Sequence, residues 1–372
     1  MSTQSESQKT KTILIDVIPQ RMTPKQSLER LAELEELTNT YGGIVVVKKY
    51  QRRLHPHPKM FIGPGKVEEL AVEGPAVGAK LLIINDRLKP RQMYELSERL
   101  GKAGMQVWDR MDLILKIFGK HANNAEAKLE IELASIGHMG PRIYGMGMEL
   151  SRQGGGIGTL GQGETNTEIM KRHLKERERT VKDKLKTYQT SRDLQRANRS
   201  RKGLKTVAIV GYTNAGKTTL LNALTGRKEY AANELFATLD TRVGSLYLPK
   251  LMKTVLISDT IGFIRDLPPE LIQAFASTLS EAVHADLLLH VVDASDKNAA
   301  KHMEVVEDVL GKIGADKIPR VVVWNKADRL SKRKVIGLTR PLLLKERGLV
   351  VSAATGVGMD ELTARIEKAL FP

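Results

Sequence analysis

One short segment constrains this chain more than any other. The apolar run KTVAIV (Lys205–Val210) is followed directly by GYTNAGKTT (Gly211–Thr219) and then by an apolar helical stretch, LLNALTG. A buried strand, a Gly-x-x-x-x-Gly-Lys-Thr loop and a helix, in this order, form the setting in which such a loop binds phosphate. A glycine turn that merely starts a helix is the weaker interpretation, because of the strand before it. The segment predicts an α/β domain built around a phosphate-binding loop.

Each residue type in this loop has a physical role. Gly211 and Gly216 let backbone N–H groups converge on phosphate oxygens, and the start of the following helix adds its partial positive charge. Lys217 is expected to reach the β- and γ-phosphates, and Thr218 to offer its hydroxyl to Mg²⁺.

A later strand ends in residues that fit the same site. TVLISD (Thr254–Asp259) ends in a carboxylate that can hold Mg²⁺, usually through water. Gly262 leaves its N–H free to approach a γ-phosphate. Asp-x-x-Gly alone is a common turn, but its place after a phosphate loop favours the metal site.

The motif Asn-Lys-x-Asp predicts which base is bound. It ends the apolar strand RVVVWNKAD (Arg320–Asp328). Asp328 can accept hydrogen bonds from guanine N1–H and the 2-amino group, whereas adenine has no 2-amino donor and its N1 is an acceptor. Asn325 is expected to tie the base to the loop and Lys326 to lie along the base plane, and the N–H of Ala353 can serve guanine O6. The sequence therefore predicts a guanine nucleotide.

The N-terminal part alternates short strands with helices, which indicates a small parallel α/β unit. We expect strands at 13–18, 42–50, 80–86 and 105–109, and helices at 25–37, 67–73 and 90–102. The predicted organisation is a disordered tail (1–11), an α/β subdomain (12–121), a long antiparallel helical hairpin with a glycine-rich loop (122–203) and a P-loop domain (204–372).

The second helix of the hairpin carries much of the chain's charge of +16. Between Thr165 and Lys205 there are fourteen Lys or Arg against five Asp or Glu. A solvated helix face with i,i+4 ion pairs is the ordinary explanation. Five acids cannot pair fourteen bases, however, so we favour a polyanion-binding arm, and the 4% aromatic content points to phosphate contacts rather than base stacking.

Other features limit the classes of protein that remain. The absence of cysteine excludes disulfides, thiolate zinc sites and cysteine nucleophiles. The first residues lack the core of a signal peptide and no apolar run is long enough for a membrane span, so we expect a cytoplasmic protein, with peripheral membrane association left open. His55 and His57 are expected in a loop, and Gly63–Lys66 as a tight turn rather than a phosphate site.

Together these motifs resemble the HflX family of ribosome-associated GTPases, within the translation-factor class. The resemblance covers roughly residues 14–370 and is carried by FIGPGKVEEL, GGIGTLGQGET, GYTNAGKTT, FATLDTR, DTIGFI, NKAD and VSA. It implies a Ras-like GTPase domain and binding to the large ribosomal subunit and its rRNA through the basic helix and the glycine-rich loop. Some members split stalled ribosomes.

The chain departs from the family pattern in several places. Gly161–Glu164 reads Gly-Gln-Gly-Glu where the family usually has Gly-Pro-Gly-Glu, and an additional C-terminal domain of some members is expected to be absent. A Pro-Thr insertion is missing before Arg242, which leaves Thr238 as the first choice for the hydroxyl that senses Mg²⁺, with Thr241 second.

Phe263 stands where many GTPases place a glutamine that orients the attacking water. We therefore expect slow intrinsic hydrolysis, unless the ribosome or a cation positions the attacking water and offsets charge. Asn214 resembles a loop asparagine that binds K⁺ in related GTPases; the alternative is a residue that only shapes the turn. Hydrolysis rates in KCl and NaCl would separate the two.

The predicted site is therefore large. The nucleotide-binding residues are Gly211, Tyr212, Thr213, Asn214, Ala215, Gly216, Lys217, Thr218, Thr219, Phe236, Thr238, Asp259, Gly262, Asn325, Lys326, Asp328, Ser352 and Ala353. The metal ligands are Thr218, Thr238 and Asp259, and the catalytic residues are Lys217, Thr238, Gly262 and Asn214.

The leading hypothesis is a GTP-hydrolysing switch, monomeric in solution, that binds the large ribosomal subunit and splits or rescues stalled ribosomes. Two alternatives stay open. One is an RNA-binding scaffold whose affinity the nucleotide only tunes, which hydrolysis unaffected by ribosomes would favour. The other is a potassium-dependent GTPase in tRNA or rRNA maturation.

Overall fold

The structure, a computed structural model, describes residues 9–153, 166–226, 236, 242–265, 268, 271–272, 275–331 and 348–372; for 143–153, 166–167 and 276–278 it describes the backbone only. The chain divides into two compact units. One comprises residues up to 120 and 131–182, and the other 121–130 and 183–372. The boundaries expected at 12–121, 122–203 and 204–372 stay predictions. Among the described helices, none is both long and apolar enough to cross a membrane.

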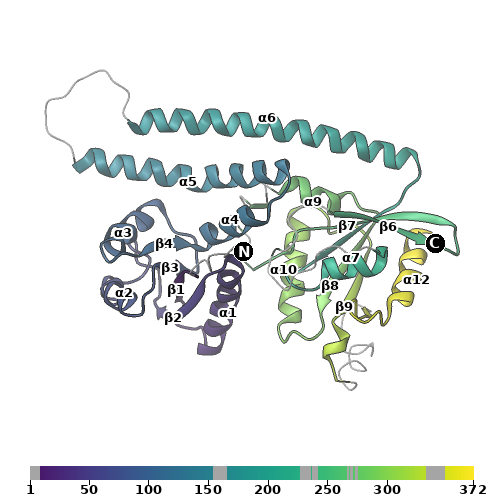
Figure 1. Ribbon diagram of the computed structural model, residues 1–372, viewed down its shortest axis with the longest axis horizontal. Helices are drawn as coiled ribbons and strands as arrows, with labels where there is room; N and C mark the ends of the chain where they lie inside the picture. Colours follow the sequence, from purple (N-terminus) through teal and green to yellow (C-terminus); the bar gives the residue numbers. More distant parts are fainter. Residues whose placement is uncertain are drawn as a thin grey trace, which may run out of the picture. The chain divides into compact units, whose positions relative to one another are not determined.

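The first unit contains a parallel sheet with the strand order β2-β1-β3-β4 (Figure 1). Its strands are β1 (Lys11–Ile18), β2 (Ile44–Arg52), β3 (Leu81–Ile84) and β4 (Gln106–Asp109). The connecting helices are α1 (Pro24–Tyr41), α2 (Pro64–Ala76) and α3 (Pro90–Gly101). Each begins with proline, whose fixed φ suits the first helical position and which needs no N–H partner there. The predicted strand and helix order is confirmed.

One helix of this unit was not predicted. α4 (Arg110–His121) follows β4 without a break, and Asp109 and Asp112 cap its first turn reciprocally. The Asp112 N–H donates to Asp109 Oδ1 at 2.8 Å, and the Asp109 N–H donates to Asp112 Oδ2 at 3.0 Å. Local capping thus starts a helix where no glycine or proline marks a boundary.

A buried charge cluster holds the next helix, α5 (Ala125–Gln153), against this corner. Arg142 pairs with both Asp109 and Asp112, and His138 Nε2 lies 3.1 Å from Asp112 Oδ1. Although burial opposes ionisation, His138 and Arg142 lower the pKa of Asp112 to about 2. Two carboxylates and a histidine this close have metal-ligand spacing, but the Arg142 guanidinium already supplies the positive charge.

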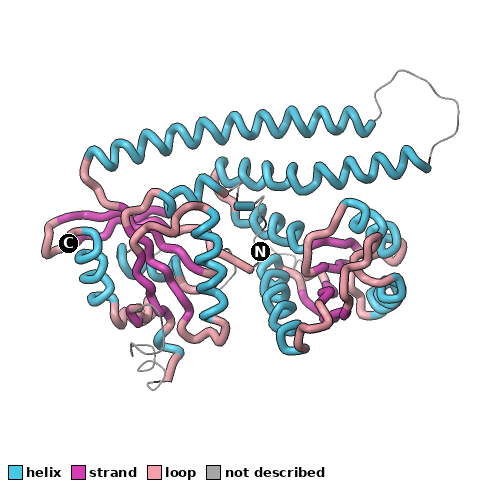
Figure 2. Tube along the Cα trace, turned by 180° about the vertical axis from the view of Figure 1, so that it is seen from behind, coloured by secondary structure: helices cyan, strands magenta, loops and turns pink. Residues whose placement is uncertain are grey.

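α5 and α6 (Asn166–Arg201) lie side by side and antiparallel (Figures 1 and 2). Arg177 pairs with Glu132, Arg192 Nη2 lies 2.7 Å from Glu126 Oε2, and Val181 is buried. The helical hairpin is therefore confirmed. Residues 154–165, which hold the predicted glycine-rich loop, lie outside the described residues.

The second unit contains a sheet with the order β10-β9-β8-β5-β7-β6, in which only the β6–β7 pair is antiparallel. Its strands are β5 (Thr206–Gly211), β6 (Arg242–Leu248), β7 (Lys253–Asp259), β8 (Leu287–Asp293), β9 (Arg320–Asn325) and β10 (Leu349–Val350). Its other elements are α7 (Lys217–Thr225), α9 (Ala276–Val283), α10 (Ala299–Lys312), the 3₁₀ turn η1 (Ala327–Arg329) and α12 (Met359–Leu370). Parallel strands bring the segments after β5, β7, β8, β9 and β10 to one edge of the sheet, where ligands bind in such folds.

The core of this unit contains one histidine that we expect to make the protein acid-sensitive. His290 on β8 is 1% exposed, and burial, with help from Arg320, lowers its pKa to about 4. In the unfolded chain a histidine has a pKa near 6.5, so below that pH the unfolded state binds the proton first. Stability is therefore lost from about pH 6.5 down to about pH 4.

His290→Leu removes this loss. The wild type should lose about 2 kcal/mol of unfolding free energy through His290 between pH 7.5 and pH 5, and the variant should not, so the difference between the two proteins grows by that amount. Thermal unfolding of both proteins across this range measures the difference. Parallel curves for the two proteins would show that His290 is not the acid-sensitive group.

Candidate guanine-nucleotide site

The phosphate loop joins β5 to α7, and its two glycines are required by their neighbours. A Cβ at Gly211 would overlap the carbonyl oxygen of Val291 on β8. Gly216 has φ +90°, and a Cβ there would overlap Nδ2 of Asn325. Asn214 is exposed and also left-handed, with φ 59°. The loop is thus shaped by the strands beside it as well as by its own sequence.

Lys217 is buried at the start of α7. Its Nζ donates a hydrogen bond to the backbone oxygen of Tyr212 at 2.9 Å, so the ammonium group folds back over the loop. Burial lowers the pKa of Lys217 to about 8; nearby Asp259 opposes this shift and Lys326 adds to it. The side chain therefore remains mostly protonated at neutral pH, as a phosphate ligand must be.

The structure brings together Thr218 and Asp259, two of the predicted metal ligands. Thr218 Oγ1 donates to Asp259 Oδ2 at 2.7 Å, which joins the first turn of α7 to the end of β7. A hydroxyl and a carboxylate oxygen are the hard donors that Mg²⁺ prefers, so the pair fits a magnesium site. Thr238, the third predicted ligand, lies outside the described residues, as does Thr241. Phe236 is buried with φ 58°.

The segment after Asp259 closes on the phosphate loop through its backbone. The N–H of Thr213 donates to the carbonyl oxygen of Phe263 at 2.8 Å, and the N–H of Phe263 donates to that of Gly211 at 3.1 Å. A Cβ at Gly262 would lie 2.8 Å from Lys217 Nζ and 2.9 Å from Thr213 Cα, so only glycine fits there. Phe263 itself is buried.

One amide joins two loops of the site. Asn325 Nδ2 donates to the carbonyl oxygen of Ala215 at 3.0 Å, and its Oδ1 accepts from the N–H of Ala353 at 3.0 Å. The sequence predicts that Asn325 ties the base to the loop; in the structure its amide connects the phosphate loop to the segment after β10. To donate to guanine O6 as well, the Ala353 N–H would have to be shared between O6 and Asn325 Oδ1.

The predicted base-reading carboxylate is held from the opposite loop. Ser352 Oγ donates to Asp328 Oδ1 at 2.5 Å. Lys326, left-handed with φ 62°, donates to the Asn214 carbonyl oxygen at 2.6 Å and pairs with Asp293 Oδ2 at 2.8 Å. Thr219, the remaining predicted residue, lies half-buried on α7.

Sequence reasoning missed two partners at this edge. Asp293 ends β8, and a carboxylate at the carboxyl end of a buried strand was the available signal. His302 on α10 stacks on the ring of Tyr212, with ring centroids 3.8 Å apart. Tyr212 also accepts a hydrogen bond at its hydroxyl from the N–H of Arg265 at 2.8 Å.

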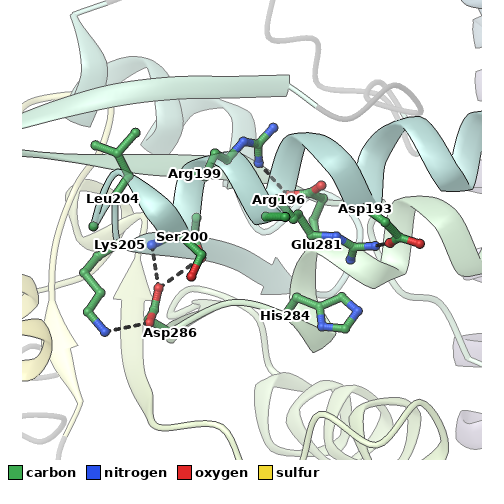
Figure 3. A pocket seen from close by; sticks show the side chains of 12 residues that line it. Asp193, Arg196, Arg199, Ser200, Leu204, Lys205, Glu281, His284 and Asp286 are labelled. Atoms are coloured by element: carbon green, nitrogen blue, oxygen red, sulfur yellow. Dashed lines mark hydrogen bonds and ion pairs between the residues drawn. The ribbon is translucent and has the colours of Figure 1, made fainter.

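A separate cavity of about 420 Å³ lies where α6 meets the other ends of β5 and β8 (Figure 3). Its lining mixes both signs of charge, and its cations are paired: Arg196 with Asp193, Arg199 with Glu281 and Lys205 with Asp286. The cavity therefore offers no positive surface for a phosphate.

Three family models of GTP-binding proteins match successive segments of the chain. Family models described as "GTP-binding GTPase N-terminal", "GTP-binding GTPase Middle Region" and "50S ribosome-binding GTPase" match residues 28–119, 121–199 and 206–326. The structure is also similar to the crystal structure of the SsGBP–GDP complex, with a TM-score of 0.52 and 25% identity over 96% of this chain and 98% of that one.

Curated relatives show the same similarity over nearly the whole length. The GTPase HflX of Caldanaerobacter subterraneus subsp. tengcongensis is 41% identical over 98% of this chain and 81% of its own. The GTPase HflX of Escherichia coli K12 is 39% identical over 94% and 80%, respectively. The chain therefore belongs to the HflX family, and it is a GTP-binding protein that hydrolyses GTP.

Proposed function

We propose that the GTP-bound protein binds the large ribosomal subunit in the cytoplasm, that hydrolysis releases it, and that this cycle splits or rescues stalled ribosomes. The observation that carries the proposal is the basic surface of α6 in a chain whose GTPase domain matches a ribosome-binding family. rRNA is the polyanion that would meet this surface.

Six cations of α6 and the residues just after it are exposed and, within the described residues, make no side-chain hydrogen bond or ion pair. They are Lys175, Arg179, Lys184, Lys186, Arg201 and Lys202. Lys175, Arg179 and Lys186 recur at helical spacing and share one face with Lys182. Because the buried Val181 marks a different face, this stripe is open to a partner. It supports binding to phosphates rather than to bases.

The end of α6 is attached to the GTPase domain beside α9. Arg196 Nη1 lies 3.4 Å from Ser280 Oγ. Arg199 Nη1 lies 3.4 Å from Glu281 Oε2, a contact drawn in Figure 3. α9 follows the Asp259–Gly262 segment along the chain, so a change there when nucleotide binds has a short route to α6. This supports a nucleotide-controlled arm.

Within the nucleotide site we assign roles as follows. Lys217 holds the β- and γ-phosphates, Gly262 offers its N–H to the γ-phosphate, and Asp328 reads guanine. Thr218 and Asp259, with Thr238, would hold Mg²⁺, which when bound neutralises charge on the phosphates. Asn214 remains the candidate ligand for K⁺, to be tested by hydrolysis in KCl and NaCl.

A charge-reversal variant tests the ribosomal contact. Lys175, Arg179 and Lys186 are replaced together by Glu, and the protein is sedimented with large subunits and a non-hydrolysable GTP analogue. We expect the affinity for the large subunit to fall at least roughly 10-fold, because each replaced cation removes a phosphate contact. Affinity for GDP should be unchanged.

The matched control reverses three exposed lysines elsewhere, Lys80, Lys102 and Lys317. It should sediment like the wild type. Equal binding by both triple variants would remove α6 from the contact. A wild type that fails to sediment with the subunit would overturn the ribosomal proposal and leave the GTPase assignment standing.

A further inference from the structure

The third residue of the phosphate loop carries a hydroxyl that the loop itself does not use. Thr213 is 7% exposed, and its Oγ1 is buried without a hydrogen-bond partner among the described residues. Leaving a hydroxyl buried without a hydrogen-bond partner is unfavourable. The loop geometry does not require this cost, because the contact between Thr213 and Phe263 is made by the backbone N–H and not by the side chain.

The position of Thr213 indicates where its side chain would act. A Cβ placed on Gly262 would lie 2.8 Å from Thr213 Cγ2 and 2.8 Å from Lys217 Nζ. The Thr213 side chain and the Lys217 ammonium group therefore approach the same backbone segment from the phosphate loop. Since Lys217 and the Gly262 N–H are the groups assigned to the γ-phosphate, Thr213 lies at that end of the triphosphate site.

The site lacks a polar side chain at the position where many GTPases place a glutamine. Phe263, which stands where many GTPases use glutamine, is buried and has no polar atom in its side chain. A threonine hydroxyl can rotate about χ1 and donate a hydrogen bond. The hydroxyl keeps its proton, so it can stabilise negative charge on a phosphate by donating a hydrogen bond, and it does not act as a base.

We propose that Thr213 Oγ1 donates a hydrogen bond to the γ-phosphate of GTP and stabilises the charge that this group carries during hydrolysis; this rests on the proposed nucleotide site. In the reaction, water oxygen bonds to the γ-phosphorus and the bond to the β–γ bridging oxygen breaks. GDP and inorganic phosphate leave, and the water's proton goes to phosphate. Thr213 keeps its own proton throughout.

The test compares Thr213→Val, which keeps the shape and loses the hydroxyl, with Thr213→Ser, which keeps the hydroxyl. Single-turnover GTP hydrolysis and the affinities for GTP and for GDP are measured on the full chain. We expect Thr213→Val to slow hydrolysis roughly 10- to 100-fold, as for a lost hydrogen bond to a charged group, with GDP affinity changed less than about twofold. Thr213→Ser should stay within about threefold of the wild type.

Two controls keep the result decisive. Thr213→Ala, which adds no bulk, must show the same loss as the valine variant. Thr363→Val makes the same change on α12, where the hydroxyl only bonds the Met359 carbonyl oxygen, and should leave hydrolysis unchanged. Wild-type rates in Thr213→Val and Thr213→Ala, or equal losses of GTP and GDP affinity, would overturn the role of Thr213. A wild type without GTP affinity would instead overturn the proposed site.

Discussion

Asp328→Asn is expected to change the base preference of the protein from guanine to xanthine. The aspartate carboxylate accepts from both guanine N1–H and the 2-amino group, whereas the asparagine amide would place a donor against that amino group. Xanthine carries an oxygen at position 2, which accepts from the same amide. Ser352 Oγ can still donate to the remaining oxygen at position 328, so the loop keeps its geometry.

Loss of charge-assisted hydrogen bonds of about 1.5–3 kcal/mol each predicts a roughly 100-fold or greater fall in GTP affinity, with a comparable gain for XTP. Competition binding with GTP, XTP and ATP measures this. Asp316→Asn changes an exposed aspartate of the same unit and should alter none of the affinities. Unchanged GTP affinity in Asp328→Asn would remove Asp328 from base recognition.

Lys217→Met is expected to abolish productive triphosphate binding. Methionine matches the length of the buried stem but removes the positive charge at the first residue of α7, the charge that we assign to the phosphates. We expect GTP affinity to fall by about 100-fold and single-turnover hydrolysis by at least that factor. Lys317→Met is the exposed control.

The lowered pKa of Lys217 adds a pH signature to this experiment. Above about pH 8 the free protein loses the ammonium proton and must regain it to bind phosphate. Wild-type GTP affinity should therefore fall by up to about tenfold per pH unit above this value, with proton uptake on binding. Lys217→Met should show neither effect. The same slope in both proteins would assign the proton to another group.

Sequence reasoning recovered the elements whose signals are local. The strands of the first unit are visible in the sequence as short apolar runs. The phosphate loop and the Asn-Lys-x-Asp motif are recognised by residue types at fixed spacing. α4 was missed because the reciprocal capping by Asp109 and Asp112 replaces the glycine and proline signals of a boundary. Residue spacing does not reveal such a cap when the helix follows a strand directly.

The partners that were missed are distant along the chain. Asp293 meets Lys326, and His302 stacks on Tyr212, only because strand order brings β8 and α10 beside the loop. Sequence spacing gives the residue types at each strand end but not which strands are neighbours. The role of Asn325 was incomplete for the same reason, since its partners Ala215 and Ala353 come from two other loops.

The double attachment of Asn325 has a consequence for accuracy. If the base binds between η1 and the end of β10, as we propose, a purine that does not fit there would displace the segment to which this amide is bonded, and the displacement would be passed on to Ala215 in the phosphate loop. We therefore expect a wrong base to weaken the binding of the phosphates as well as of the ring.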